Sequence, residues 1–401
     1  MSRFEKILFS VNLLIYTFLF VFSFSYVDLN LTLSKNKYVL DFVGFMQGLG
    51  YFNRPLATAI YVIFLAIAFS FFAVNLWLFH KSRIGEKYLK CSVVLNTLIL
   101  IFAYPYLSSD LFNYIFDAKI IVQYHTNPYT HKPLDFEGDE WLRFMRWVHR
   151  YSPYGPLWLI LSTIPAVLGF GKFILNFFAF KIFIGLFHLL NSYLIFSTLR
   201  KVKIKNILLG TAFYALNPLF LIEGVANAHN DIVLATFLIL IIYFYVNRQK
   251  AKSIIALLLG VLIKYIPMLT LPWIILGAFG KKILNYEKIV FLNFASMLIF
   301  TFVFSTFPIK VPFVPGGSTQ VQFQPWYLFW TIPYIALLPI WSLMILGILI
   351  SLGASLRYVP FLFYGDWSHA HTILFMQTAT ILPLVVGFLV IFIQKLLVKD
   401  K

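Results

Sequence analysis

The chain has 401 residues, of which 61% are hydrophobic and only 12% are charged. Soluble globular domains are about 45–50% apolar and about 25% charged, so this composition excludes a soluble protein and indicates a single integral membrane domain over residues 1–401. The formal net charge of +17 would suit a nucleic-acid-binding protein, but the positions of the basic residues, given below, argue against that partner.

A helix of about 20 apolar residues crosses a bilayer, and the sequence predicts an all-α polytopic membrane protein with about twelve such helices. No small-residue cleavage site follows the first apolar run, so we expect an uncleaved helix there. The predicted spans are residues 7–26, 56–79, 91–107, 173–198, 207–222, 231–246, 253–265, 266–279, 288–307, 326–341, 342–358 and 373–394.

The basic residues indicate the orientation of these helices. If the N-terminus is inside, more than half of the 32 Lys and Arg residues fall in short cytoplasmic segments, as the positive-inside rule requires. These segments are residues 3–6, 81–90, 200–205, 248–252, 281–288 and 395–401. The charge is therefore explained by orientation in a cell membrane, with both termini cytoplasmic and no nucleic-acid partner.

Residues 157–169 are apolar but do not fit the alternation. If they crossed the membrane, the basic cluster at Arg200 would lie outside. The segment is short and contains Pro165, so we expect a re-entrant or interfacial helix. Irregular backbone at that depth must line a cavity or be buried in protein, which predicts a cavity beside the preceding segment.

The preceding segment, residues 108–156, is the main polar region of the chain and is predicted to be extracytoplasmic. Its first part is expected to form an amphipathic helix from Asp110 to about Val122, with Asn113, Tyr114 and Asp117 on the same face as Asp110. Asp110 lies where the chain leaves the membrane, and it is either a catalytic carboxylate or a helix N-cap. Asp117 either faces a site or belongs to a solvated helix face.

Three arginines follow at helical spacing: Arg143, Arg146 and Arg150. They predict either a phosphate clamp or a helix resting on anionic lipid headgroups. Asn127 and Tyr129 belong to an Asn-Pro-Tyr turn signal. Tyr154 belongs to a rigid turn that returns the chain to the membrane.

Three later polar spots are predicted at outer ends of spans. His229, Asn230 and Asp231 can bind hydroxyl groups or cap a helix, and one His with one Asp is too little to predict a metal site. Lys264 lies between two short apolar segments, where a lysine needs an anion such as a lipid phosphate, or a path to the interface. Gln324 and Trp326, within residues 322–327, form an outer mouth or an ordinary interfacial aromatic belt.

Together these motifs resemble a known family. The stretch Ser109-Asp110-Leu111-Phe112-Asn113-Tyr114, followed by Asn127-Pro128-Tyr129 and Tyr154-Gly155-Pro156-Leu157, resembles the first catalytic loop of GT-C glycosyltransferases. It is most similar to that of bacterial polyprenyl-phosphate-mannose-dependent α-mannosyltransferases. The family's later motifs are matched in the same order by Asn217-Pro218, His229-Asn230-Asp231, Lys264 with Pro267, and Gln324-Pro325-Trp326-Tyr327.

The resemblance, which covers about residues 110–327, implies a GT-C-like fold with jaw-type amphipathic helices on the outer face. It implies Asp110 as catalytic carboxylate, a polyprenyl-phosphate-linked sugar donor, chemistry on the extracytoplasmic face, and inversion at the sugar. The residue chemistry is compatible, because an ionised Asp can accept the proton of an acceptor hydroxyl. Lys264 and an arginine can stabilise the leaving phosphate.

We therefore expect a membrane hexosyltransferase that moves mannose to a glycan or glycolipid acceptor in the cell envelope. No Asp-x-Asp motif is present, so neither a metal nor another cofactor is expected. Two alternatives stay open at this point. One is a transferase for another lipid-phosphate-linked sugar, and the other is a transporter or flippase of lipid-linked glycans, although transporters often show internal repeats and none is evident here.

Overall fold

The computed structural model describes residues 1–279, 284–304, 323–367 and 369–399, and within these ranges the chain is helical with no strand. The α-helices are α1 Arg3–Ser23, α2 Lys37–Leu49, α3 Arg54–His80, α4 Glu86–Ile101, α5 Asp110–Val122, α6 Pro156–Leu168, α7 Phe173–Lys201, α8 Ile207–Ala215, α9 Asp231–Val246, α10 Lys250–Val261, α11 Leu271–Phe279, α12 Tyr286–Ile299, α13 Ile332–Leu337, α14 Trp341–Leu356, α15 Val359–Tyr364 and α16 Ala370–Lys399. The tighter or wider helical turns that matter below are η3 Glu140–Phe144, the π-helix η4 Phe220–Ala226, η5 Ile266–Thr270 and η7 Pro325–Trp330.

Within the described ranges, six helices are long and apolar enough to cross a membrane. The pair α8 and η4, bent by 56°, would make a seventh if it is one span. The predicted all-α membrane class is confirmed, but the count of about twelve spans is not. Several predicted spans correspond to helices well short of the roughly 20 residues that a bilayer requires, such as α9 with 16 residues and α10 with 12.

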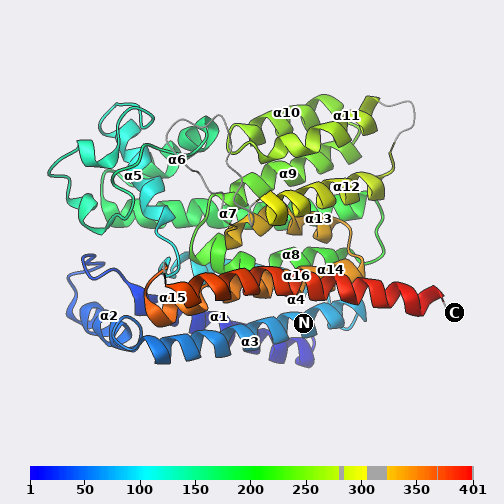
Figure 1. Ribbon diagram of the computed structural model, residues 1–401, viewed down its shortest axis with the longest axis horizontal. Helices are drawn as coiled ribbons and strands as arrows, with labels where there is room; N and C mark the ends of the chain where they lie inside the picture. The colour runs from blue at the N-terminus through cyan, green and yellow to red at the C-terminus, as the bar shows by residue number, and fades with distance from the viewer. Residues whose placement is uncertain (280–283, 305–322, 368, 400–401) are drawn as a thin grey trace.

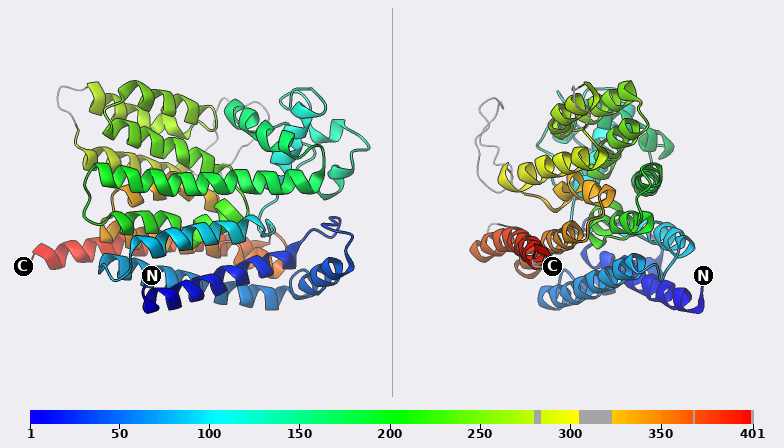
Figure 2. Two further views of the ribbon diagram at one scale, coloured as in Figure 1. Left: turned by 180° about the vertical axis from the view of Figure 1, so that it is seen from behind. Right: turned by 90° about the vertical axis from the view of Figure 1, so that its right-hand side faces the viewer.

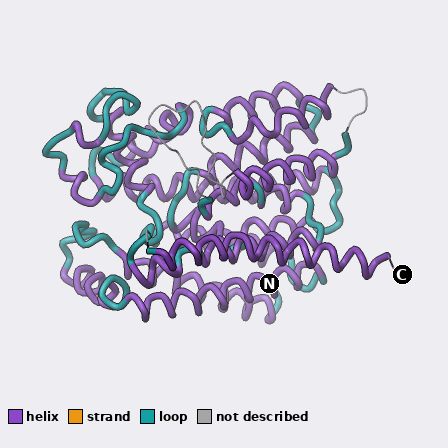
Figure 3. Tube along the Cα trace, viewed as in Figure 1, coloured by secondary structure: helices purple, strands orange, loops and turns teal. Residues whose placement is uncertain are grey.

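The long helices run side by side along the longest axis of the molecule (Figure 1). Both termini lie at one end of the bundle, and α2 together with the segment from α5 to α6 lies at the other end (Figure 2). Loops gather at that second end (Figure 3). This arrangement places the polar segment 108–156 away from both termini, which the predicted topology requires. Which side of the membrane each end of the bundle faces stays a prediction.

Helix α2 was not predicted from the sequence. Asn36 begins it, because its side chain accepts a hydrogen bond from the Tyr38 backbone N–H at 2.9 Å. Large apolar side chains such as Tyr38 and Phe45 are exposed on it. A short helix with exposed aromatic residues beside a bundle of membrane helices is typical of an interfacial helix. The jaw-type role of this helix and of α5–α6 stays a prediction.

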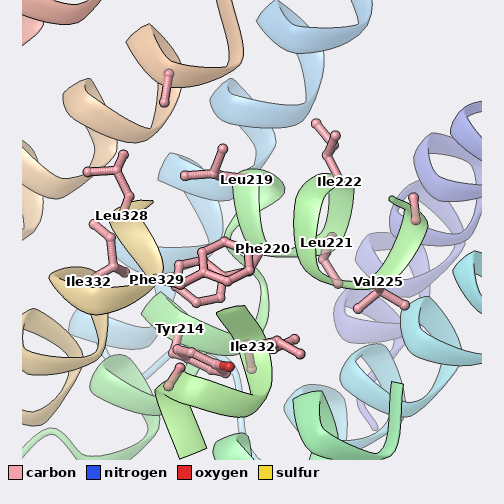
Figure 4. Close-up of a cluster of buried hydrophobic side chains, with 14 of the residues drawn as sticks. Tyr214, Leu219, Phe220, Leu221, Ile222, Val225, Ile232, Leu328, Phe329 and Ile332 are labelled. Atoms are coloured by element: carbon pink, nitrogen blue, oxygen red, sulfur yellow. The ribbon is translucent and has the colours of Figure 1, made fainter. Parts of the chain in front are cut away.

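The core nearest the site surrounds η4, as Figure 4 shows. The Phe220 ring of η4 stacks on Phe329 of η7 with 4.1 Å between ring centroids, and Tyr214 of α8 meets Phe220 edge-on at 4.5 Å. Lys181 of α7 is fully buried, and its ammonium group donates hydrogen bonds to the carbonyl oxygens of Val225, at 2.7 Å, and Ala226. These contacts fix both faces of η4, the element from which the polar site is built.

Candidate active site

Asp110 is the first residue of α5, whose predicted bounds are confirmed. The N-cap position is held by Ser109, so Asp110 is not the capping residue. Its carboxylate instead faces the His229 imidazole, with 3.5 Å between Oδ2 and Nδ1, and the Asp110 side chain keeps 23% of its surface exposed. Asp110 is therefore a carboxylate with a buried partner on one side and open space on the other.

His229 is fully buried between two acids. Its Nε2 lies 3.2 Å from Oε2 of Glu223, opposite the contact with Asp110. The ring stacks on Trp326 of η7 with 3.8 Å between centroids. The backbone N–H of His229 donates to the Glu223 carbonyl at 3.0 Å. Residues from three distant parts of the chain thus meet at one imidazole.

The electrostatics of this pair favour the charged forms. Burial by itself would raise the pKa of Asp110, but the nearby His229 and the charges of Lys264 and Arg150 hold that pKa below its usual range. Burial would lower the pKa of His229, but Asp110 and Glu223 outweigh burial and raise the pKa to about 9. At neutral pH the site therefore holds a carboxylate against an imidazolium.

Asp231 and Lys264 form a second ion pair beside the first. Lys264 Nζ lies 2.7 Å from Oδ2 of Asp231, which is fully buried, whereas the Lys264 side chain is 25% exposed. The indole N–H of Trp330 donates to Oδ1 of Asp231 at 2.8 Å. Lys264 thus has a protein counter-ion and still reaches open space, and its role toward a phosphate stays a prediction.

The predicted Tyr154 turn lies directly against the Lys264 loop. The Gly155 N–H donates to the Ile263 carbonyl at 3.2 Å, and the Leu157 N–H donates to the Leu262 carbonyl at 3.0 Å. A Cβ on Gly155 would lie 2.2 Å from the Leu262 carbonyl oxygen, so only glycine allows this close backbone approach. Two motifs more than 100 residues apart in the sequence are therefore held together through the main chain.

Aromatic side chains line the region between the two motifs. Tyr114 packs edge-on against Tyr154, with 4.9 Å between ring centroids, and its hydroxyl accepts a hydrogen bond from the Asn230 backbone N–H at 3.3 Å. The Tyr129 hydroxyl donates to the Tyr154 carbonyl at 2.7 Å. Asn230 is fully buried, and neither atom of its side-chain amide has a partner. An unpartnered buried amide is costly, and the role of Asn230 toward a hydroxyl group stays a prediction.

The arginine helix predicted over residues 143–150 is wrong. Only η3, from Glu140 to Phe144, is helical there, and the chain is extended at Met145. Arg143 is exposed, and Arg146 lies 3.8 Å from Asp28 at the surface. Arg150 stacks on Trp147 and is the arginine whose charge acts on Asp110.

Asp117 does not lie on a solvated face, as one alternative held, because it is buried in α5. Burial raises its pKa to about 7, although the neighbouring Ser152 hydroxyl opposes the rise. Asn113 is also buried, with its side-chain oxygen unpartnered. Asn127 accepts a hydrogen bond from the Tyr129 N–H at 2.9 Å, which makes a local turn. Gln324 begins η7 next to Trp326, and residue 322 lies outside the described residues.

Sequence reasoning gave no role to three residues that the structure places at the site: Glu223, Trp330 and Lys181. Glu223 and Lys181 lay beside or inside an apolar stretch taken as a span, where a charged residue is expensive and therefore indicates function, whereas Trp330 carries no charge that could have marked it. Within the described ranges, no three His, Cys, Asp or Glu residues group as a metal site.

Comparison with known proteins matches the chain to a family model. The family model for alpha-(1->6)-mannopyranosyltransferase, N-terminal domain, matches residues 31–280. The matched range includes Asp110, His229, Asp231 and Lys264 but ends before Trp326. No match was found among curated proteins or among solved structures.

Proposed function

Because the chain belongs to the alpha-(1->6)-mannopyranosyltransferase family, a family of GT-C mannosyltransferases, we propose that it moves mannose from a polyprenyl-phosphate donor to a glycan or glycolipid acceptor. The reaction takes place on the extracytoplasmic face, with Asp110 as the general base and without a metal. The observation that carries the proposal is the partly exposed Asp110 carboxylate, held against the buried His229.

The proposed step is a single displacement. The acceptor hydroxyl oxygen forms a bond to the anomeric carbon while the bond from that carbon to the phosphate oxygen breaks. The proton of the hydroxyl passes to Asp110, and the electron pair leaves with the polyprenyl phosphate. A positioned base of this kind contributes typically about 10²–10⁴-fold to a rate. Asp110 suits the role because the cations around it keep it ionised at neutral pH.

The leaving phosphate needs positive charge rather than a proton. Lys264 is the best-placed cation, since its ammonium group is both partly exposed and tied to Asp231. Arg150 is the second, because its charge reaches Asp110. Arg143 and Arg146 lie on the surface and suit contacts with lipid headgroups.

The polar and aromatic residues around Asp110 supply contacts for the sugars. Asn230 has free donors and acceptors for hydroxyl groups. Trp326 and Tyr154 present ring faces and edges of the kind that pack against the apolar face of a sugar. A single displacement inverts the anomeric carbon, so an α-linked product, as the family description states, requires a β-linked mannosyl phosphate donor.

The donor class can be tested with purified protein in lipid nanodiscs. Radiolabelled β-mannosyl polyprenyl phosphate and labelled GDP-mannose are offered in parallel with an α-1,6-oligomannoside acceptor. We expect label to enter the acceptor from the lipid donor alone, in a bond that α-mannosidase cleaves. Transfer from GDP-mannose, or a β-linked product, would contradict the proposed donor or the proposed inversion.

A further inference from the structure

The contact between His229 and Glu223 takes no direct part in the displacement at the sugar. Glu223 is fully buried in η4, and its Oε2 accepts a hydrogen bond from the Asn227 side chain at 3.0 Å as well as facing His229. A buried carboxylate needs a paired charge and hydrogen bonds. Within the described residues, His229 is the only cationic side chain with an ion-pair contact to Glu223.

The two acids together determine the protonation of the imidazole. Asp110 faces Nδ1 and Glu223 faces Nε2. A neutral imidazole carries one N–H and can donate to only one of them, which would leave the other acid facing a lone pair. Neither ring nitrogen makes a hydrogen bond to a described residue, so both contacts are ion pairs, at 3.5 Å and 3.2 Å. Only the doubly protonated ring carries the positive charge that both acids require, which favours the imidazolium.

The backbone of η4 is arranged to produce this geometry. The π-helical turn brings both the carbonyl and the carboxylate of Glu223 to His229, and single π-turns occur frequently at functional sites. Ala228 has φ of 58°, a conformation that costs energy for a residue with a Cβ. Lys181 holds the end of η4 through the Val225 and Ala226 carbonyls. The strained backbone and the buried lysine therefore both serve to place His229.

We propose that Glu223 is a positioning residue, which through the His229 imidazolium fixes the carboxylate of Asp110 for the acceptor hydroxyl. The contact with His229 engages Oδ2 of Asp110, which leaves Oδ1 to take the proton. This inference rests on the proposed function, since it gives Asp110 the role of base. Asp110 is the catalytic residue, and Glu223 acts on it only through His229.

Other charged groups around the imidazole must be considered in a pH experiment. Asp110 faces it from α5 and Glu223 from η4, while the ring of Trp326 covers one face and carries no charge. Asp231, from α9, is already paired with Lys264. The charges of Lys264 and Arg150 act on Asp110. Removal of the Glu223 charge should therefore affect the protonation of His229 more than that of any other group at the site.

The test is the pH dependence of kcat and of donor KM for wild type and Glu223→Gln. In wild type, activity should fall above about pH 9 as His229 loses its proton. Glutamine keeps the shape but not the charge, so we expect this alkaline limb to move down by at least about one pH unit, toward the ordinary imidazole range. We expect kcat at pH 8 to fall about tenfold or more, with donor KM changed less than twofold.

Asp139→Asn is the matched control. Asp139 is also an acid of an ion pair, with Lys119 at 2.5 Å, but it lies in the loop after α5 and has no contact with His229. The Asp139→Asn substitution should leave unchanged the pH above which activity falls. A structural role for Glu223 predicts the same behaviour for both variants, namely lower activity at every pH and an unmoved limb, and that result would overturn the inference.

Two further outcomes are decisive. If Glu223→Gln does not fold, the wild-type profile alone still tests the inference, because unchanged kcat up to pH 10 would show that the imidazolium is not needed. If wild type transfers no mannose at any pH from any lipid-phosphate donor, the proposed function fails and the inference fails with it. If wild type is active but the alkaline limb of Glu223→Gln stays at the wild-type pH, only the proposed role of Glu223 is contradicted.

Discussion

Gly155→Ala tests whether the Tyr154 turn and the Lys264 loop must touch for the enzyme to work. Gly155 has φ of −66°, a value that any residue adopts, so the glycine is required by space alone. The new Cβ would lie 2.2 Å from the Leu262 carbonyl oxygen and 2.7 Å from the Ile263 carbonyl oxygen. Both are backbone atoms that cannot rotate away, so the two segments must separate.

Separation of the two segments would break two main-chain hydrogen bonds. The bonds from Gly155 to Ile263 and from Leu157 to Leu262 contribute about 1 kcal/mol each in net terms. Overpacking adds about 1–3 kcal/mol, so the total is about 3–5 kcal/mol. Part of this destabilisation is local, since the turn can lift without unfolding the bundle. We expect a lower midpoint of thermal denaturation and a donor KM raised about tenfold or more, because Lys264 moves with its loop.

The matched control is Gly44→Ala, in α2. No atom lies within 4 Å of a Cβ at that position, and alanine favours a helix over glycine by about 1 kcal/mol. This variant should be as stable as wild type, or more stable, with donor KM unchanged. If Gly155→Ala behaved like Gly44→Ala in both assays, the close approach would be unnecessary and the reasoning about the two motifs would be refuted.

Three further predictions concern charge and topology. Lys264→Met should raise donor KM about 10–100-fold, as expected when a charged hydrogen bond is removed. Adding Asp231→Asn to this variant should restore thermal stability but not donor KM. A restored donor KM would show that Lys264 serves only to neutralise Asp231. Burial raises the pKa of Asp117 to about 7, so the folded state binds this proton more tightly than the unfolded state, and the free energy of unfolding should fall as pH rises from about 4 through about 7. Asp117→Asn should make the thermal denaturation midpoint less dependent on pH over this range. An unchanged pH dependence would contradict the assignment. A cysteine in place of the exposed Glu137, in a Cys91→Ala background, should react with a membrane-impermeant maleimide on intact cells; reaction only after permeabilisation would reverse the proposed orientation.

Much of the site could be predicted because polar residues are rare in this chain. His229, Asp231 and Lys264 stood out against apolar surroundings, and Asp110 stood out at the start of the polar segment 108–156. The structure brings these four residues together in two adjacent ion pairs. The bounds of α5 were also predictable from helical spacing and from the polar residues before it. Their roles in binding and catalysis stay proposals.

Other features depend on tertiary contacts that no local pattern reveals. The π-turn of η4 has a period that a 3.6-residue pattern does not detect, so the placement of Glu223 against His229 was not foreseen. The three arginines have helical spacing, but aromatic packing of Phe144 on Phe173 and stacking of Arg150 on Trp147 hold that segment in a nonhelical path. The predicted span count relied on apolar length, whereas several apolar stretches fold as short helices with breaks between them.

The most direct test of the account compares wild type with Asp110→Asn in nanodiscs, fed β-mannosyl polyprenyl phosphate and an oligomannoside acceptor at neutral pH. Asparagine keeps the size and the place beside His229 but cannot take a proton. We predict that transfer falls by at least about 10²-fold, while donor binding and thermal stability stay near those of wild type. Transfer within a few-fold of wild type by a folded Asp110→Asn protein would contradict the assignment of Asp110 as the base.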